Sequence, residues 1–117
     1  MNAAAFRRLL KHKVTIQRQS TAKNDITGAE TESWAEVSTD VPALIQPLSS
    51  KQLLKVQGLH LVATFAGFFM FAEDVQLRDK VILEGKTYFV EGVESGWSGG
   101  QDHKETYLRA MEEQKNG

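Results

Sequence analysis

The feature of this sequence that most constrains its fold is a series of short segments in which apolar and polar residues alternate. In the first of them, Val14 and Ile16 fall on one face and Thr15 and Gln17 on the other, which is the pattern of a half-buried β-strand. Glycine, proline and Asn-Asp signals interrupt such segments about every eight to twelve residues. This spacing is typical of a mainly β domain, and we expect a small antiparallel β-barrel or sandwich of about six strands.

The turn signals place the strands along the chain. Residues 19–29 predict a loop, and Gly85-Lys86 predicts a tight hairpin turn. Pro42 and Pro47 should lie at strand ends or on a sheet edge, because proline cannot donate to a strand ladder. The expected strands are residues 13–18, 31–38, 43–46, 59–65, 79–84, 87–93 and 105–111.

A chain of 117 residues is enough for a single domain. We expect an N-terminal helix or arm over residues 1–11, a barrel core over residues 12–111 and a polar tail over residues 112–117. One or two short helices are expected, the N-terminal one and a central one over residues 51–57. The central helix should begin after Ser50 as its N-cap and stop at Gly58.

Composition argues against several classes of protein. The chain has no cysteine, so it can form no disulfide and has no thiolate for catalysis or metal binding. Its longest apolar stretch, residues 65–72, is far shorter than the ~20 residues of a membrane span, and we expect no membrane partner. The net charge of −1 lacks the basic footprint of a protein that wraps nucleic acid.

One catalytic pattern occurs, at residues 96–100 (GWSGG), which matches G-x-S-x-G with Asp102 and His103 nearby. A nucleophile elbow requires a strand, a sharp turn and a helix in an α/β sheet, whereas this match lies between two strand-like segments. Glycines in a hairpin tip explain it more simply. The three histidines do not pair at zinc-site spacing. We therefore predict no enzyme and no catalytic, metal or cofactor residue.

Residues 65–71 hold four of the six phenylalanines. Alternation would place Phe65, Phe69 and Phe71 on one face and Phe68 and Met70 on the other. A strand that is apolar on both faces must be covered twice, either by the core of its own domain or by a neighbouring subunit. The sequence leaves both possibilities open.

Charge is unevenly distributed along the chain. Residues 1–24 contain six basic residues and no acid, whereas the remainder carries a formal charge of −7. A basic end and an acidic body can attract each other between neighbouring subunits, although a solvated helix end explains the basic cluster equally well. The candidate subunit interface combines both features and consists of Phe68, Phe69, Met70, Phe71, Arg7, Arg8 and Lys11.

The order of segments resembles that of phage head–tail joining and head-completion proteins. Residues 12–18 (HKVTIQR) look like the opening HRVTIQR of that family, followed by a loop with Asp25 and Gly28 and then by Trp34 and Val37. Residues 41–49 (VPALIQPLS) are similar to its A-x-I-x-P-L-S run, and residues 80–90 (KVILEGKTYFV) to its later R-V-x-x-x-G-R-x-Y-x-I hairpin.

The resemblance implies a small β-barrel subunit that forms a homo-oligomeric ring below the portal, closes the DNA channel after packaging and offers a surface to the tail. Implied partners are portal or adaptor proteins and a tail-terminator or tail-tube protein, with packaged DNA close by. The implied location is the virion, after assembly in the host cytoplasm. Relatives project a central loop into the channel, and the matching residues here are Ser49, Ser50, Lys51, Gln52, Lys55, Gln57 and Gly58.

Two other functions remain open at this stage. One is a tail terminator or another minor connector protein, which stays within the structural class. The other is a small β-barrel binding module for nucleic acid, which would need exposed aromatic and basic residues on one sheet face.

Overall fold

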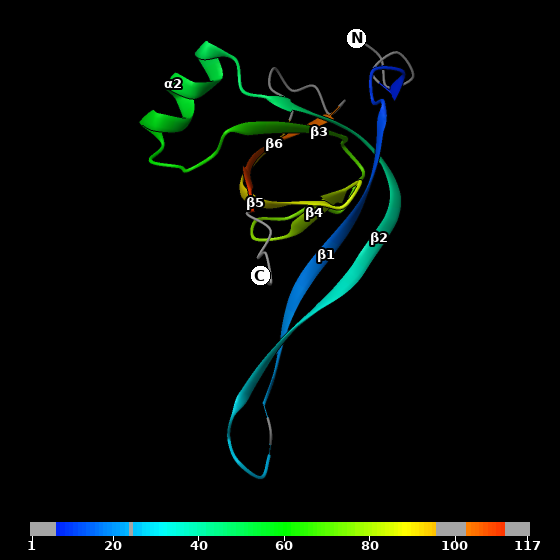
Figure 1. Cartoon of the computed structure of the whole chain (residues 1–117), viewed down its shortest axis with the longest axis vertical. Helices are drawn as coiled ribbons and strands as arrows, with labels where there is room; N and C mark the ends of the chain where they lie inside the picture. Colours follow the sequence, from blue (N-terminus) through cyan, green and yellow to red (C-terminus); the bar gives the residue numbers. More distant parts are fainter. Residues whose placement is uncertain (1–6, 24, 96–102, 112–117) are drawn as a thin grey trace, which may run out of the picture.

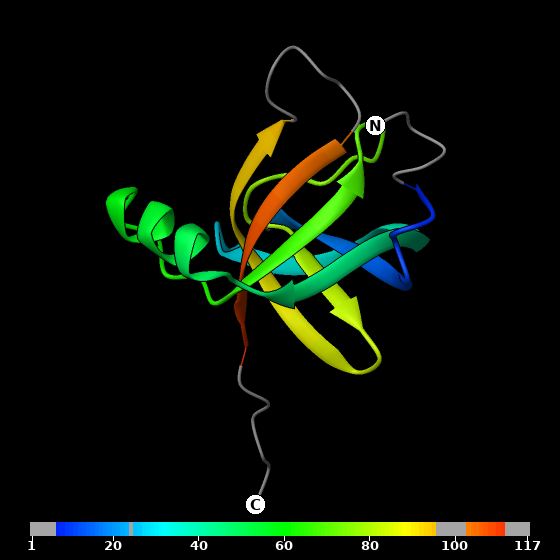
Figure 2. The ribbon, with the colours of Figure 1, turned by 90° about the horizontal axis from the view of Figure 1, so that it is seen from above.

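Six antiparallel strands close into a barrel in a computed structural model that describes residues 7–23, 25–95 and 103–111 (Figure 1). The strands follow one another around the barrel in the order β1-β2-β3-β6-β5-β4 (Figure 2). The predicted mainly β fold is thus confirmed. Because the sheet is closed, the fold is a barrel and not a sandwich. The strands are β1 His12–Lys23, β2 Glu30–Pro47, β3 Phe65–Met70, β4 Lys80–Leu83, β5 Lys86–Ser95 and β6 His103–Ala110.

The barrel interior is filled by side chains that recur at every second position of the strands. Val14 and Ile16 of β1 point inward, as the alternation predicts, and both are fully buried. The other strands supply their inward residues in the same way, so that one apolar cluster fills the barrel. Its buried members are Val14, Ile16, Val41, Ala43, Ile45, Phe69, Val75, Val81, Tyr88, Val90 and Leu108.

The loop predicted for residues 19–29 is wrong at its start and correct at its end. β1 continues to Lys23 and β2 begins at Glu30, so only the residues between them connect the strands. Ser20 and Ser33 form a hydrogen bond across the two strands, with 3.0 Å between their hydroxyl oxygens. The end of β1 is mostly polar, which is why no alternation marked residues 19–23 as a strand.

Two further strand boundaries differ from the prediction. Pro42 lies inside β2, at a point where β2 pairs with Lys13 of β1 and has not yet begun to pair with β3, so the position resembles a sheet edge. Pro47 ends β2 as predicted. The strand predicted at residues 59–65 is wrong, because residues 59–64 connect α2 to β3 and bury Ala63 beneath the helix.

The local turn and cap signals are confirmed to within one residue. The β4–β5 turn is Glu84-Gly85, one residue earlier than predicted, and both residues have the positive φ of a tight hairpin turn (49° and 82°). The central helix α2, Ser50–Gly58, has Ser49 and not Ser50 as its N-cap. Residues 7–9 form one turn, closed by a 3.1 Å bond from Leu10 N to Arg7 O. The rest of the predicted N-terminal helix, the GWSGG segment with Asp102, and the tail lie outside the described residues.

Replacing Gly67 with alanine should destabilise the barrel. An added Cβ would lie 2.7 Å from Thr106 Oγ1 and 2.9 Å from Leu108 Cδ1, and both side chains are fully buried. Thr106 cannot turn away without losing the 2.9 Å hydrogen bond that its hydroxyl donates to Gly67 O. We expect the free energy of unfolding to fall by about 1–3 kcal/mol in urea titrations. Gly58→Ala is the control, since nothing lies within 4 Å of its added Cβ. An equal loss in the two variants would refute the overpacking argument.

Candidate functional site

The helix α2 is inserted between β2 and β3 and lies outside the barrel (Figure 1). Its start is defined by a capping box: Gln52 N donates to Ser49 Oγ at 3.2 Å, and Ser49 N donates to Gln52 Oε1 at 2.8 Å. All the residues predicted for the channel segment therefore lie on one helix or its N-cap, namely Ser49, Ser50, Lys51, Gln52, Lys55, Gln57 and Gly58.

Polar side chains hold α2 against the wall formed by β5 and β6. Gln52 Nε2 donates to Glu105 Oε1 at 2.7 Å. Lys55 Nζ lies 2.7 Å from Glu94 Oε2, and the Tyr107 hydroxyl donates to the same oxygen at 3.2 Å. The bond to Glu94 raises the pKa of Lys55 above its ordinary value, and burial raises that of Tyr107. Together with Lys51 and His103 these residues line a cleft of about 440 Å³.

The apolar contact beneath α2 is small. Val56 is the buried residue of the helix. It packs on a cluster outside the barrel whose other buried members are Leu48, Ala63, Ala66 and Tyr107. Since one residue of the helix contributes to this cluster and the Lys55–Glu94 pair is largely exposed, the attachment of α2 to the barrel is weak.

Large apolar side chains on α2 and in the segment after it face solvent. Leu54 is 71% exposed and Val62 67% exposed, and Leu53 and Leu59 are also exposed. We call these four residues the α2 apolar surface. These four residues come from one helix and the segment that follows it, and exposed apolar side chains that gather on one surface are typical of contact sites.

The phenylalanine-rich strand β3 is divided between the core and the surface. Phe69 is fully buried inside the barrel, so its side chain cannot contribute to a subunit interface as the sequence had suggested. Phe65 packs edge-on against Tyr88, with 5.3 Å between ring centroids. Of the predicted interface, Phe68, Met70 and Phe71 are half-buried, and Arg7, Arg8 and Lys11 are exposed.

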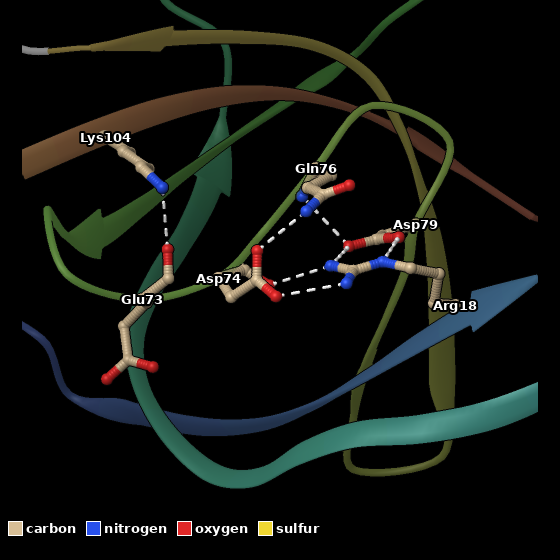
Figure 3. A network of polar contacts seen from close by, with 6 residues as sticks. All are labelled: Arg18, Glu73, Asp74, Gln76, Asp79 and Lys104. Atoms are coloured by element: carbon tan, nitrogen blue, oxygen red, sulfur yellow. Dashed lines mark hydrogen bonds and ion pairs between the residues drawn. The ribbon is translucent and has the colours of Figure 1, made fainter.

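A buried ion-pair network that the sequence did not predict lies where β1 leaves the barrel (Figure 3). Arg18 donates from Nε and Nη2 to the two carboxylate oxygens of Asp79, at 3.0 and 2.9 Å. It also binds the Asp74 carboxylate at 3.1 Å and the Asp74 carbonyl at 3.1 Å. The side chain of Asp79 is only 2% exposed, and it also accepts from Gln76 N at 2.9 Å.

This network fastens β1 to the connection between β3 and β4. The hydrogen bonds to Asp79 raise the pKa of Arg18, and the guanidinium lowers the pKa of Asp74. Beside the network, Lys104 of β6 donates to the Glu73 carbonyl at 2.8 Å (Figure 3). Arg18 is 56 and 61 residues from its two partners along the chain, so no local pattern could have indicated the pairs.

The described residues offer little chemistry beyond binding. No three histidine, aspartate or glutamate side chains gather there as metal ligands. His12 accepts a 3.1 Å hydrogen bond from Ile45 N, which gives it a structural partner. No helix in this part of the chain is long and apolar enough to cross a membrane.

A closed six-stranded barrel with one helix inserted between β2 and β3 defines the fold as that of a small β-barrel protein. The family model for phage head completion proteins matches residues 7–113. The chain therefore belongs to the phage head completion protein family, which gives it a structural role in completing the head. Membership also places it in the virion, in contact with other virion proteins.

Solved structures of similar fold support the barrel. Protein SF1141 from Shigella flexneri 2a matches with a TM-score of 0.70 at 21% identity, covering 86% of this chain and 92% of its own. The phage-like element PBSX protein xkdH from Bacillus subtilis matches with a TM-score of 0.53 at 13% identity, covering 85% of this chain and 92% of its own. At these identities the likeness concerns the fold. No curated protein matches the sequence significantly.

Proposed function

We propose that this protein forms a ring of identical subunits below the portal, which closes the DNA channel after packaging and presents the surface to which the tail attaches. Its family gives it a role in head completion. A ring requires two different patches on each subunit, since each copy must contact its two neighbours through different surfaces. The exposed cations of residues 7–13 can serve as one of these patches, and an acidic surface of the neighbouring copy as the other.

The single observation that carries the gating role is the arrangement of α2. The helix is inserted in one connection of an otherwise closed barrel, and its apolar surface points away from its own chain. Closing a channel requires contacts between neighbouring subunits around the lumen, and exposed leucines and a valine can supply them by burying apolar area. The attachment of α2 through side-chain bonds to Glu94 and Glu105 allows the helix to shift without unfolding the barrel.

The proposal predicts that Leu54→Gln combined with Val62→Gln will release packaged DNA. Both side chains are mostly exposed, so the variant should fold with nearly unchanged stability. In heads that carry the variant, the fraction retaining DNA should fall at least several-fold, measured by nuclease sensitivity and electron microscopy. Leu77→Gln is the matched control, because Leu77 is an exposed leucine between β3 and β4.

Particle morphology distinguishes this role from that of its nearest alternative. Leaky heads in the α2 variant support channel closure. Full heads with tails of abnormal length would instead support a tail terminator. Full heads with normal tails would show that α2 takes part neither in channel closure nor in tail termination.

A further inference from the structure

The far part of the β1–β2 hairpin has no neighbouring strand to support it. β1 pairs with β4 only as far as Gln17, and β2 pairs with β3 only from Ala43 onward. Residues 18–23 and 30–35 therefore pair only with each other, and Figure 1 shows this two-stranded ribbon projecting well beyond the barrel. We call residues 18–40 the arm. A lone two-stranded hairpin is marginally stable in water, so such an arm would gain stability from contact with another molecule.

Several local devices set the direction of the arm. β1 has register shifts between Val14 and Gln17, where it leaves the barrel. Asp40 of β2 has a φ of 52°, which is costly for a residue other than glycine and bends the strand at the same level. Arg18 ties the base of the arm to Asp79. The arm is thus held at a definite angle by strained and buried groups.

The charge of the arm identifies a complementary surface. Residues 18–40 contain two basic residues, Arg18 and Lys23, and five acids, a formal charge of −3, and Arg18 is itself paired with Asp79. Residues 7–13, which we call the basic segment, contain four cations and no acid, a formal charge of +4. Arg7, Arg8, Lys11 and Lys13 are exposed, and within the described ranges none of them forms an ion pair. The same holds for Asp25, Glu30, Glu36 and Asp40 of the arm.

The far part of the arm cannot reach the basic segment of its own molecule, whereas Asp40 at its base lies near Lys13, because Val41 pairs with Val14. In Figure 1 the tip of the arm lies at the bottom of the long axis, and residues 7–11 (dark blue) lie at the top. The protein is 53 Å long and 30 by 27 Å across, so the ends are far apart. A second copy of the chain offers the matching surface, whereas DNA would be repelled by the acidic arm.

We propose that the arm of one copy docks on the basic segment of the next. The inference rests on the proposed ring and specifies one contact within it. Because arm and basic segment are different surfaces, each copy can donate one and accept the other, as a closed ring requires. Exposed ion pairs are individually weak and screened by salt, so several must act together and the contact should weaken as salt rises.

Cysteine cross-linking in assembled particles tests this contact. The chain has no cysteine, so each introduced thiol is unique. Two variants are produced together in the same cells: one carries Arg8→Cys, and the other carries Asp25→Cys or Glu36→Cys. All three positions are exposed. After treatment of purified particles with a bismaleimide, we expect a covalent dimer of the two variants, and little dimer when either variant is present alone.

Charge reversal provides the specificity control. Glu30→Lys with Glu36→Lys, introduced into the variant that carries Asp25→Cys, should lower the yield of dimer several-fold. Adding Lys11→Glu and Lys13→Glu to the Arg8→Cys chain should restore it. A yield that does not respond to either reversal would overturn the docking by charge.

The remaining outcomes separate this inference from the proposed function. Particles that contain the protein but yield no dimer of the two variants overturn the arm contact and leave the connector role intact. Dimers of the arm variant with itself, or links from the arm to another virion protein, also overturn it. Particles that fail to incorporate even the unmodified protein overturn the proposed function, and the arm contact with it.

Discussion

Phe69→Asp should leave the protein unfolded. Phe69 is 0% exposed and belongs to the cluster that fills the barrel, where Val14, Ile16 and Val81 are its fellow members. Removing a buried phenylalanine costs about 3–5 kcal/mol. An unpaired carboxylate in the same place adds a large desolvation penalty. Together these losses approach the whole expected stability of about 6–17 kcal/mol for a chain of this length. Far-ultraviolet circular dichroism should show loss of the β signal.

Phe71→Asp is the matched control for this variant. Phe71 follows the end of β3, is half-buried, and lies with its ring centroid 5.8 Å from Lys104 Nζ. A carboxylate there would be partly hydrated and close to a cation, so the variant should fold. If it folds yet is not incorporated into particles, Phe71 belongs to the subunit surface predicted from the sequence. Folding of the Phe69→Asp variant would contradict the buried position of Phe69.

Arg18→Met should cost about 3–5 kcal/mol of stability, because it leaves a buried carboxylate without its cation. Methionine keeps much of the length of the arginine side chain, so the change removes charge with little loss of packing. Asp79 would keep the bond from Gln76 N and lose both bonds from the guanidinium. The measurement is the free energy of unfolding from urea titrations of the variant and the parent.

Two companion variants give this prediction its specificity. Arg18→Met combined with Asp79→Leu should recover most of the loss, since replacing both members of a buried pair by apolar groups is often close to neutral. Asp74→Asn should cost less than about 1 kcal/mol, because its side chain is 55% exposed and the pair is accessible to solvent. A loss below about 1 kcal/mol for Arg18→Met would mean that Asp79 obtains other partners. It would contradict the inference that the Arg18–Asp79 pair fastens β1 to the connection between β3 and β4.

The sequence predicted those elements in which one face is buried in the protein and the other faces solvent. Val14 and Ile16 alternate with polar residues because one face of β1 is packed in the barrel, and this periodicity is visible without a structure. The turn at Gly85 and the capped start of α2 are likewise local, since the positive φ of Gly85 favours glycine and an N-cap favours a serine side chain that accepts from the helix backbone. The residues that the family resemblance assigns to the channel are close together in the sequence, so they lie together on α2 or at its N-cap.

Elements without a buried face were missed. The part of β1 that begins at Gln19 runs along the arm, where Gln19 and Ser20 are exposed, so no pattern of burial distinguished it from a loop. The strand prediction for the segment around Val62 was wrong for the opposite reason. Its apolar residues suggested a strand, whereas they lie in a connection that is partly packed under α2 and partly exposed. Composition identifies the apolar residues that favour burial, but it does not identify the surface that buries them.

The sequence by itself determined that this protein is a small antiparallel β domain with a central capped helix and a separation of charge between its ends. Tertiary structure decided which phenylalanines are core, that Arg18 is clamped by Asp79, and that an acidic arm stands clear of the barrel. The physical reason is the separation along the chain of the residues that interact. Strand alternation, turns and caps arise from neighbours along the chain, whereas burial of Phe69 and the Arg18 pairs arise only when barrel closure brings distant residues together.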